Sequence, residues 1–200
     1  MSVHIPSVPD PLSGQPHSEN WNLYDRLLQE RLIFLGQTLN SACANQTIAA
    51  MLYLDTEATN RDIRLYINTL GDLGSESLTA GLAIYDTMRC LRSDVITVCT
   101  GVATGVATFL VALGTAEKRL ALPHARLRLS QPDQIISERA VTEIDIAAQE
   151  LLRQRQMLAE VLARHTGQSV ETILADTERG TYLSPEAALE YGLIDTVVSR

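Results

Sequence analysis

The chain has 200 residues, a formal net charge of −8 and an apolar fraction of 46%, which suits one globular domain with its own core. The acidic balance argues against a nucleic-acid partner, because a phosphate backbone favours a basic protein face. A membrane span is not expected, since charged residues interrupt the apolar stretch from Leu110 to Leu122. The N-terminus has no basic region followed by an apolar block, so no secretory signal is expected. The three cysteines lack metal or redox spacing, so we expect free thiols, no metal and no cofactor.

Residues 1–20 are rich in proline and serine and predict a flexible leader before a single domain over 21–200. Hydrophobic periodicity then predicts elements in alternation. The expected helices are 21–30, 41–55, 76–90, 106–113, 142–165, 170–176 and 185–191, and the expected strands are 31–36, 63–67, 95–98, 119–122, 127–129 and 194–198. Strand and helix alternate through the first two thirds, which predicts an α/β fold with a mainly parallel sheet.

The stretch from Val95 to Gly114 is central to this prediction. Its β-branched start indicates a buried strand, and its apolar second half indicates a helix buried nearly all round. Many α/β hydrolytic enzymes place a nucleophilic serine at such a turn from strand to helix. The residue at this turn is Gly105, which has no side chain with which to attack a substrate.

The helix over 142–165 is longer than one layer over a sheet requires. Its apolar residues recur at helical spacing and leave a second apolar stripe. Two interpretations stay open at this point. The helix packs either on another subunit or in the core of its own chain.

Five segments spread over residues 21–198 resemble the proteolytic subunit of the ATP-dependent Clp protease, the ClpP family. They are Tyr24–Leu35, Leu65–Asn68, Thr79–Met88, His165–Gln168 and Glu190–Asp195. The resemblance implies the ClpP/crotonase-like α/β fold, with flanking helices and a protruding handle helix. It also implies stacked heptameric rings around a closed chamber.

Members of the ClpP family carry a Ser-His-Asp triad, and the motif match implies where its members would stand here. The nucleophile falls on Gly105 within Gly101–Thr108, the general base on Ser130, and the orienting acid on Gly180. Serine attack needs a hydroxyl, a base and a group that fixes the base. Because all three positions are substituted, the resemblance implies a subunit without catalytic residues.

The surroundings of the triad also depart from the family pattern. The loop over 69–77 carries extra residues, and its Asp72 and Glu76 would bring negative charge to a developing oxyanion if they point inward. The family's glycine-rich strand, which pairs with peptide substrate, is replaced over 133–140. We interpret Thr104, Thr108, His124, His165 and Asp176 as structural residues rather than as a displaced triad.

This pattern resembles ClpR, the inactive ClpP paralogue of cyanobacteria and plastids, which shares mixed heptameric rings with active ClpP subunits. Glu178 and Arg179 match the ClpP pair that links rings. We therefore expect a non-catalytic subunit of a Clp proteolytic core in the cytoplasm, or in the plastid stroma of a plant. Its expected partners are active ClpP-type subunits and an AAA+ chaperone ATPase. Two alternatives are an active Clp-type serine endopeptidase with an unrecognised nucleophile and, less compatible with the motifs, a crotonase-type acyl-CoA enzyme.

Overall fold

The structure is a computed structural model that describes residues 7–8, 21–58, 60–70, 75–131 and 141–199. Its main sheet has seven strands, and its central path runs β3-β4-β5-β6-β9 with every pairing parallel. These strands are β3 (Leu32–Leu35), β4 (Ile63–Thr69), β5 (Val95–Thr104), β6 (Arg119–Ala121) and β9 (Thr196–Val197). The predicted α/β architecture with a mainly parallel sheet is thereby confirmed.

Strand β5 pairs with two different strands along the same edge. Residues 97–99 pair with β6, whereas residues 102–104 pair with β7 (Arg126–Arg128), which also pairs antiparallel with β8 (Tyr182–Leu183). The predicted end of this strand at Val98 was wrong, because the strand continues through Gly101 to Thr104. A Cβ at Gly101 would lie 2.5 Å from Oδ1 of Asn68, and that oxygen accepts a bond from the Val102 amide at 3.0 Å. Glycine here therefore leaves room for the Asn68 side chain against β5 and does not form a turn.

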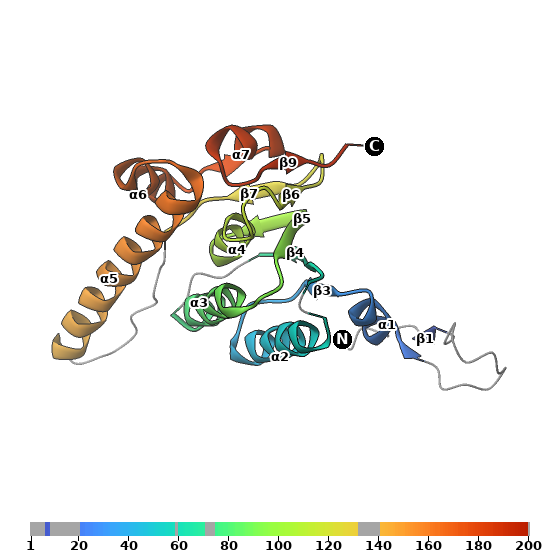
Figure 1. Ribbon diagram of the computed structural model, residues 1–200. Helices are drawn as coiled ribbons and strands as arrows, with labels where there is room; N and C mark the ends of the chain where they lie inside the picture. Colours follow the sequence, from blue (N-terminus) through green and yellow to red (C-terminus); the bar gives the residue numbers. More distant parts are fainter. Residues whose placement is uncertain (1–6, 9–20, 59, 71–74, 132–140, 200) are drawn as a thin grey trace, which may run out of the picture.

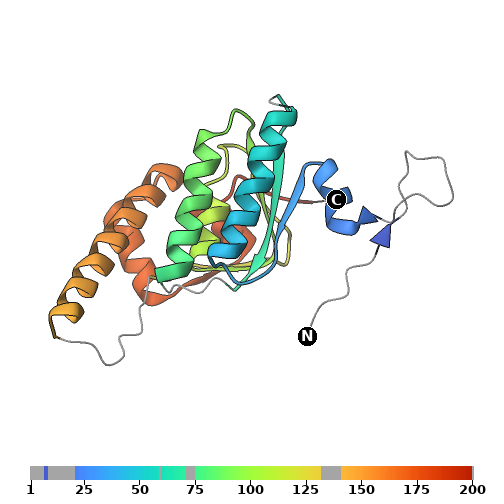
Figure 2. The same cartoon turned by 90° about the horizontal axis from the view of Figure 1, so that it is seen from below.

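Helices α2 (Ser41–Glu57), α3 (Ser75–Cys90) and α4 (Val106–Ala112) lie side by side along one face of the sheet (Figures 1 and 2). Asn40 caps the start of helix α2, where its Oδ1 accepts from the Cys43 amide at 2.9 Å. All seven residues of α4 are buried, as its apolar sequence predicts. The core forms between these helices and the sheet.

The remaining helices are α1 (Leu23–Gln29), α5 (Val141–Thr166), α6 (Val170–Arg179) and α7 (Pro185–Tyr191). Near the N-terminus, β1 (Ser7–Val8) pairs antiparallel with β2 (Trp21–Asn22). The rest of the predicted leader lies outside the described residues. In the described ranges, no helix is both long enough and apolar enough to cross a membrane.

Helix α5 combines two environments along its length. Its C-terminal part is buried against the chain's own core through Leu158, Ala159 and Leu162. Its N-terminal part projects away from the body (Figure 1), where Ile146 and Leu152 are 68% and 64% exposed. The helix is thus a core helix at one end and an unpaired apolar surface at the other.

Arg119 ties the C-terminal segments to the sheet. Its Nε donates to Asp195 Oδ2 at 2.8 Å, and its Nη1 donates to the carbonyls of Ala112, His165 and Gly192. The Arg119 and Asp195 side chains are only 9% and 20% exposed. Burial raises the pKa of Asp195, but the hydrogen bonds and charge of Arg119 outweigh it and leave that pKa below its ordinary value.

Candidate functional site

The turn from β5 into α4 has the sharp backbone expected of the nucleophile position. Gly105 has φ 53° and ψ −125°, a conformation that side chains strongly disfavour. Its amide donates to the Arg128 carbonyl at 3.2 Å, and its carbonyl accepts from the Phe109 amide at 3.3 Å. Main-chain bonds therefore hold this turn in place without any contribution from a side chain at position 105.

Ser130, the residue at the expected base position, is the second residue after β7 and is 8% exposed. The residues on either side of it are fixed to the α6–β8 connection. The Leu129 amide donates to the Thr181 carbonyl at 3.0 Å, and the Gln131 amide donates to the Thr177 carbonyl at 3.1 Å. Position 130 is consequently held beside the turn that contains position 180.

Gly180, at the expected acid position, caps the C-terminus of α6 in the left-handed conformation, with φ 68° and ψ 47°. Its amide donates to the Thr177 carbonyl at 3.3 Å. Its carbonyl accepts from Nε of Arg128 at 3.4 Å. The structure thus brings positions 105, 130 and 180 together around the end of β7, although they come from three separate segments.

The nearby threonines have structural partners. The Thr108 hydroxyl lies 2.7 Å from the Ala103 carbonyl and 2.8 Å from the Arg128 carbonyl, and the residue is fully buried. It therefore fastens α4 to β5 and β7. Thr104 is also buried, at 7% exposure.

The two histidines of the described ranges lie elsewhere. His124 is exposed in the turn between β6 and β7. His165 packs edge-on against Tyr85, with Nε2 at 3.2 Å from the tyrosine oxygen. Burial, together with the positive charges of Arg119, Arg89 and Arg164, lowers the pKa of His165.

Two acidic residues considered from the sequence have other partners. The Asp176 carboxylate accepts from the Tyr191 hydroxyl at 3.0 Å, and burial together with this contact raises the pKa of Tyr191. Oε1 of Glu76 accepts from the Ser41 amide and hydroxyl at 3.2 Å each, so this carboxylate is engaged at the start of α2. Asp72 and the segment 133–140 lie outside the described residues.

Glu178 and Arg179 stand at the exposed end of α6. Oε2 of Glu178 lies 3.0 Å from Nη2 of Arg155 on α5. Nε of the same arginine is buried and has no hydrogen-bond partner among the described residues. The sequence did not indicate this ion pair, because it joins residues 23 positions apart. Its value to the isolated chain is small, since Glu178 is 65% exposed.

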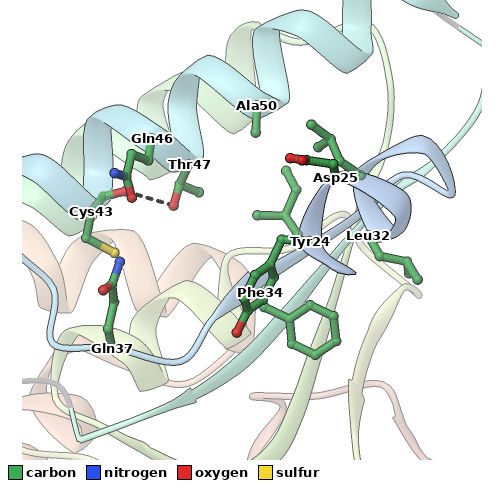
Figure 3. Close-up of a pocket in the computed structure, with 11 residues that line it drawn as sticks. Tyr24, Asp25, Leu32, Phe34, Gln37, Cys43, Gln46, Thr47 and Ala50 are labelled. Atoms are coloured by element: carbon green, nitrogen blue, oxygen red, sulfur yellow. Dashed lines mark hydrogen bonds between the residues drawn. The ribbon is translucent and has the colours of Figure 1, made fainter. Parts of the chain in front are cut away.

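A pocket opens between α1, β3 and the first half of α2 (Figure 3). Its outer wall is aromatic. The Phe34 ring stacks on Tyr66 with a centroid distance of 5.0 Å and meets Tyr24 edge-on at 6.4 Å. Tyr24 and Phe34 are 50% and 45% exposed, which gives the pocket an apolar rim. Sequence periodicity did not indicate this pocket, because its walls come from three elements.

The inner wall of the pocket is more polar and contains Gln37, Cys43 and Thr47. The Thr47 hydroxyl donates to the Cys43 carbonyl at 2.9 Å (Figure 3). Burial raises the pKa of the Cys43 thiol, so this cysteine is not an activated nucleophile. Among the described residues, no three His, Cys, Asp or Glu side chains are grouped to hold a metal ion.

Comparison with known proteins agrees with the motifs. The sequence profile of the Clp protease family matches residues 15–200. The chain is 46% identical over 200 residues to ATP-dependent Clp protease proteolytic subunit 2 of Prochlorococcus marinus strain NATL2A, covering 100% of this chain and 98% of that protein. It is 47% identical over 201 residues to proteolytic subunit 3 of Synechococcus sp. strain CC9605, with coverage of 100% and 98%. The chain therefore belongs to the Clp protease family.

Proposed function

We propose that this chain is a non-catalytic subunit of the proteolytic core of an ATP-dependent Clp protease, of the ClpR type. One observation carries the proposal. The positions that converge around the end of β7 are Gly105, Ser130 and Gly180, so the nucleophile, the base and the orienting acid are each replaced. Without these groups only binding and oxyanion contacts remain, and these supply a small part of serine-protease catalysis.

The surroundings of the site support this proposal. The Thr108 hydroxyl is bonded to two carbonyls, and the Asp176 carboxylate is bonded to Tyr191. His124 is exposed and His165 contacts Tyr85.

The retained role in this proposal is assembly. The projecting part of α5 presents Ile146 and Leu152 to solvent, and such an apolar surface favours contact with another subunit. Glu178 and Arg179 lie exposed at the nearby end of α6. We propose that this end of the molecule joins two stacked heptameric rings, which also contain active ClpP-type subunits.

Docking of an AAA+ chaperone is the second retained role. The pocket with its Tyr24 and Phe34 rim is a described surface that suits an apolar contact of this kind. The cytoplasmic location also belongs to the proposal, supported by the cyanobacterial relatives and by the free thiols of the three cysteines.

A fluorophosphonate serine probe tests the proposal. The purified chain should show no labelling and no turnover of casein or a fluorogenic peptide above background. An active ClpP-type subunit serves as the positive control. Labelling of this chain would instead establish the alternative, an active Clp-type serine endopeptidase.

A second experiment tests the assembly role. Native mass measurement of the chain, alone and mixed with an active subunit, should detect ring-sized species that contain both chains. If the two chains never share a particle at any mixing ratio, the mixed-ring proposal is overturned.

A further inference from the structure

Arg128 is the one residue of β7 that contacts two of the three substituted positions. Its carbonyl accepts from the Gly105 amide at 3.2 Å, and its Nε donates to the Gly180 carbonyl at 3.4 Å. It also lies two residues before Ser130 in the sequence. The sequence alone gave no reason to select it.

The guanidinium of Arg128 occupies the space that a side chain at position 180 would enter. A Cβ built on Gly180 would lie 3.0 Å from Nη2, 3.5 Å from Nε and 3.7 Å from Cζ of Arg128. The guanidinium also lies over the Tyr182 ring, with Cζ 5.2 Å from the ring centroid, and this cation–π contact helps to hold it in place. A positive charge therefore stands where the resemblance places an acid.

We propose that Arg128 is a positioning residue that captures any carboxylate restored at position 180 and keeps it from orienting a base at position 130. The fork of a guanidinium matches a carboxylate with two parallel hydrogen bonds, which an imidazole N–H cannot equal. A triad restored only at positions 105, 130 and 180 would thus lack its third member in function. This inference rests on the proposed non-catalytic function. It adds Arg128 to the three substituted positions as a fourth reason why the subunit is inactive.

A double-mutant cycle tests the capture directly. The variants are Gly180→Asp, Arg128→Gln and the pair together, compared by urea unfolding at pH 7.5 and pH 3. Aspartate tolerates the left-handed conformation better than most residues, so Gly180→Asp should fold. We expect a coupling of about fivefold in the unfolding equilibrium constant at pH 7.5, and a much smaller coupling at pH 3, where the carboxyl is mostly protonated. A coupling that is absent, or equal at both pH values, would overturn the proposal.

Two further variants sharpen this cycle. Arg126→Gln removes the same charge from the same strand two residues earlier, where the side chain is exposed, and should show no coupling to Gly180→Asp. Arg128→Lys keeps the charge and should retain part of the coupling. If Arg126→Gln couples as strongly as Arg128→Gln, the effect is general charge and not capture.

The consequence for chemistry is measured with the fluorophosphonate probe. Gly105→Ser, Ser130→His and Gly180→Asp are combined, with and without Arg128→Gln. Labelling should be at least about tenfold faster when Arg128 is also replaced, and equal labelling rates would contradict the positioning role. Labelling of the unaltered chain would instead overturn the proposed non-catalytic function. In that case the pH-dependent coupling would still test whether Arg128 binds a carboxylate at position 180.

Discussion

Replacing Arg119 by leucine should destabilise the chain more than most single substitutions. The change leaves the Asp195 carboxylate without its cation and leaves the carbonyls of Ala112, His165 and Gly192 without their shared donor. Removing one partner of a buried ion pair typically costs about 3–5 kcal/mol, a large fraction of the ~5–15 kcal/mol that holds a domain together. For a chain of this size, each kcal/mol corresponds to about 2–4 °C in Tm, so we expect Tm to fall by about 10 °C.

The assay is thermal unfolding by circular dichroism, with Arg153→Leu as the matched control. Arg153 also pairs with an acid, Glu150, but both side chains are about half exposed, at 63% and 47%, so its loss should change Tm little. The pKa of Asp195 is depressed in the folded chain, so its stabilising effect is full above about pH 4 and is lost as pH falls through the folded pKa. The gap between wild type and Arg119→Leu should narrow there. A Tm within about 3 °C of wild type at pH 7 would refute the reasoning.

Three further outcomes are expected. Gly105→Ser alone should remain unreactive toward the fluorophosphonate probe, because position 130 offers no base, and strong labelling would show that the site is misplaced. Arg179→Ala should lower the assembled mass in analytical ultracentrifugation and leave the circular dichroism spectrum unchanged. The control is Arg164→Ala, which removes another exposed arginine, from α5. Identical sedimentation profiles for Arg179→Ala and wild type would exclude a role of Arg179 in assembly. Because the pKa of His165 is lowered in the folded chain, unfolding takes up a proton below about pH 6.5. The unfolding free energy should therefore fall from pH 7.5 to 5.5, and His165→Gln should flatten that slope; an unchanged slope would mean that His165 titrates normally.

Hydrophobic pattern and caps were sufficient to predict most helices and the parallel strands. The side chains of Asn40, Ser169 and Ser184 each accept a backbone amide at a helix start, and such caps are local in sequence. The strand β8 was not predicted, because two residues, Tyr182 and Leu183, carry no period and are ordered only by pairing with β7. Tertiary pairing also extended β5 beyond Val98.

The candidate site, like the fold, could be predicted only in part from the sequence. The resemblance to the ClpP family selected Gly105, Ser130 and Gly180, and the structure places them around one strand end. The absence of catalysis in this subunit stays a prediction, which the probe experiment tests. Arg128 could not be selected from the sequence, because its meaning depends on a contact with a glycine 52 residues away. The pairing of Glu178 with Arg155 was missed for the same reason.

Three of the bonds that shape the site are main-chain bonds. Gly105 to Arg128, Leu129 to Thr181 and Gln131 to Thr177 are amide–carbonyl contacts, and none uses a side chain at position 105, 130 or 180. Selection can therefore act separately on the outline of the subunit and on its reactive groups. After a gene duplication, one copy could drift at these three positions without misfolding, and it would persist as long as its shape still completed a larger assembly.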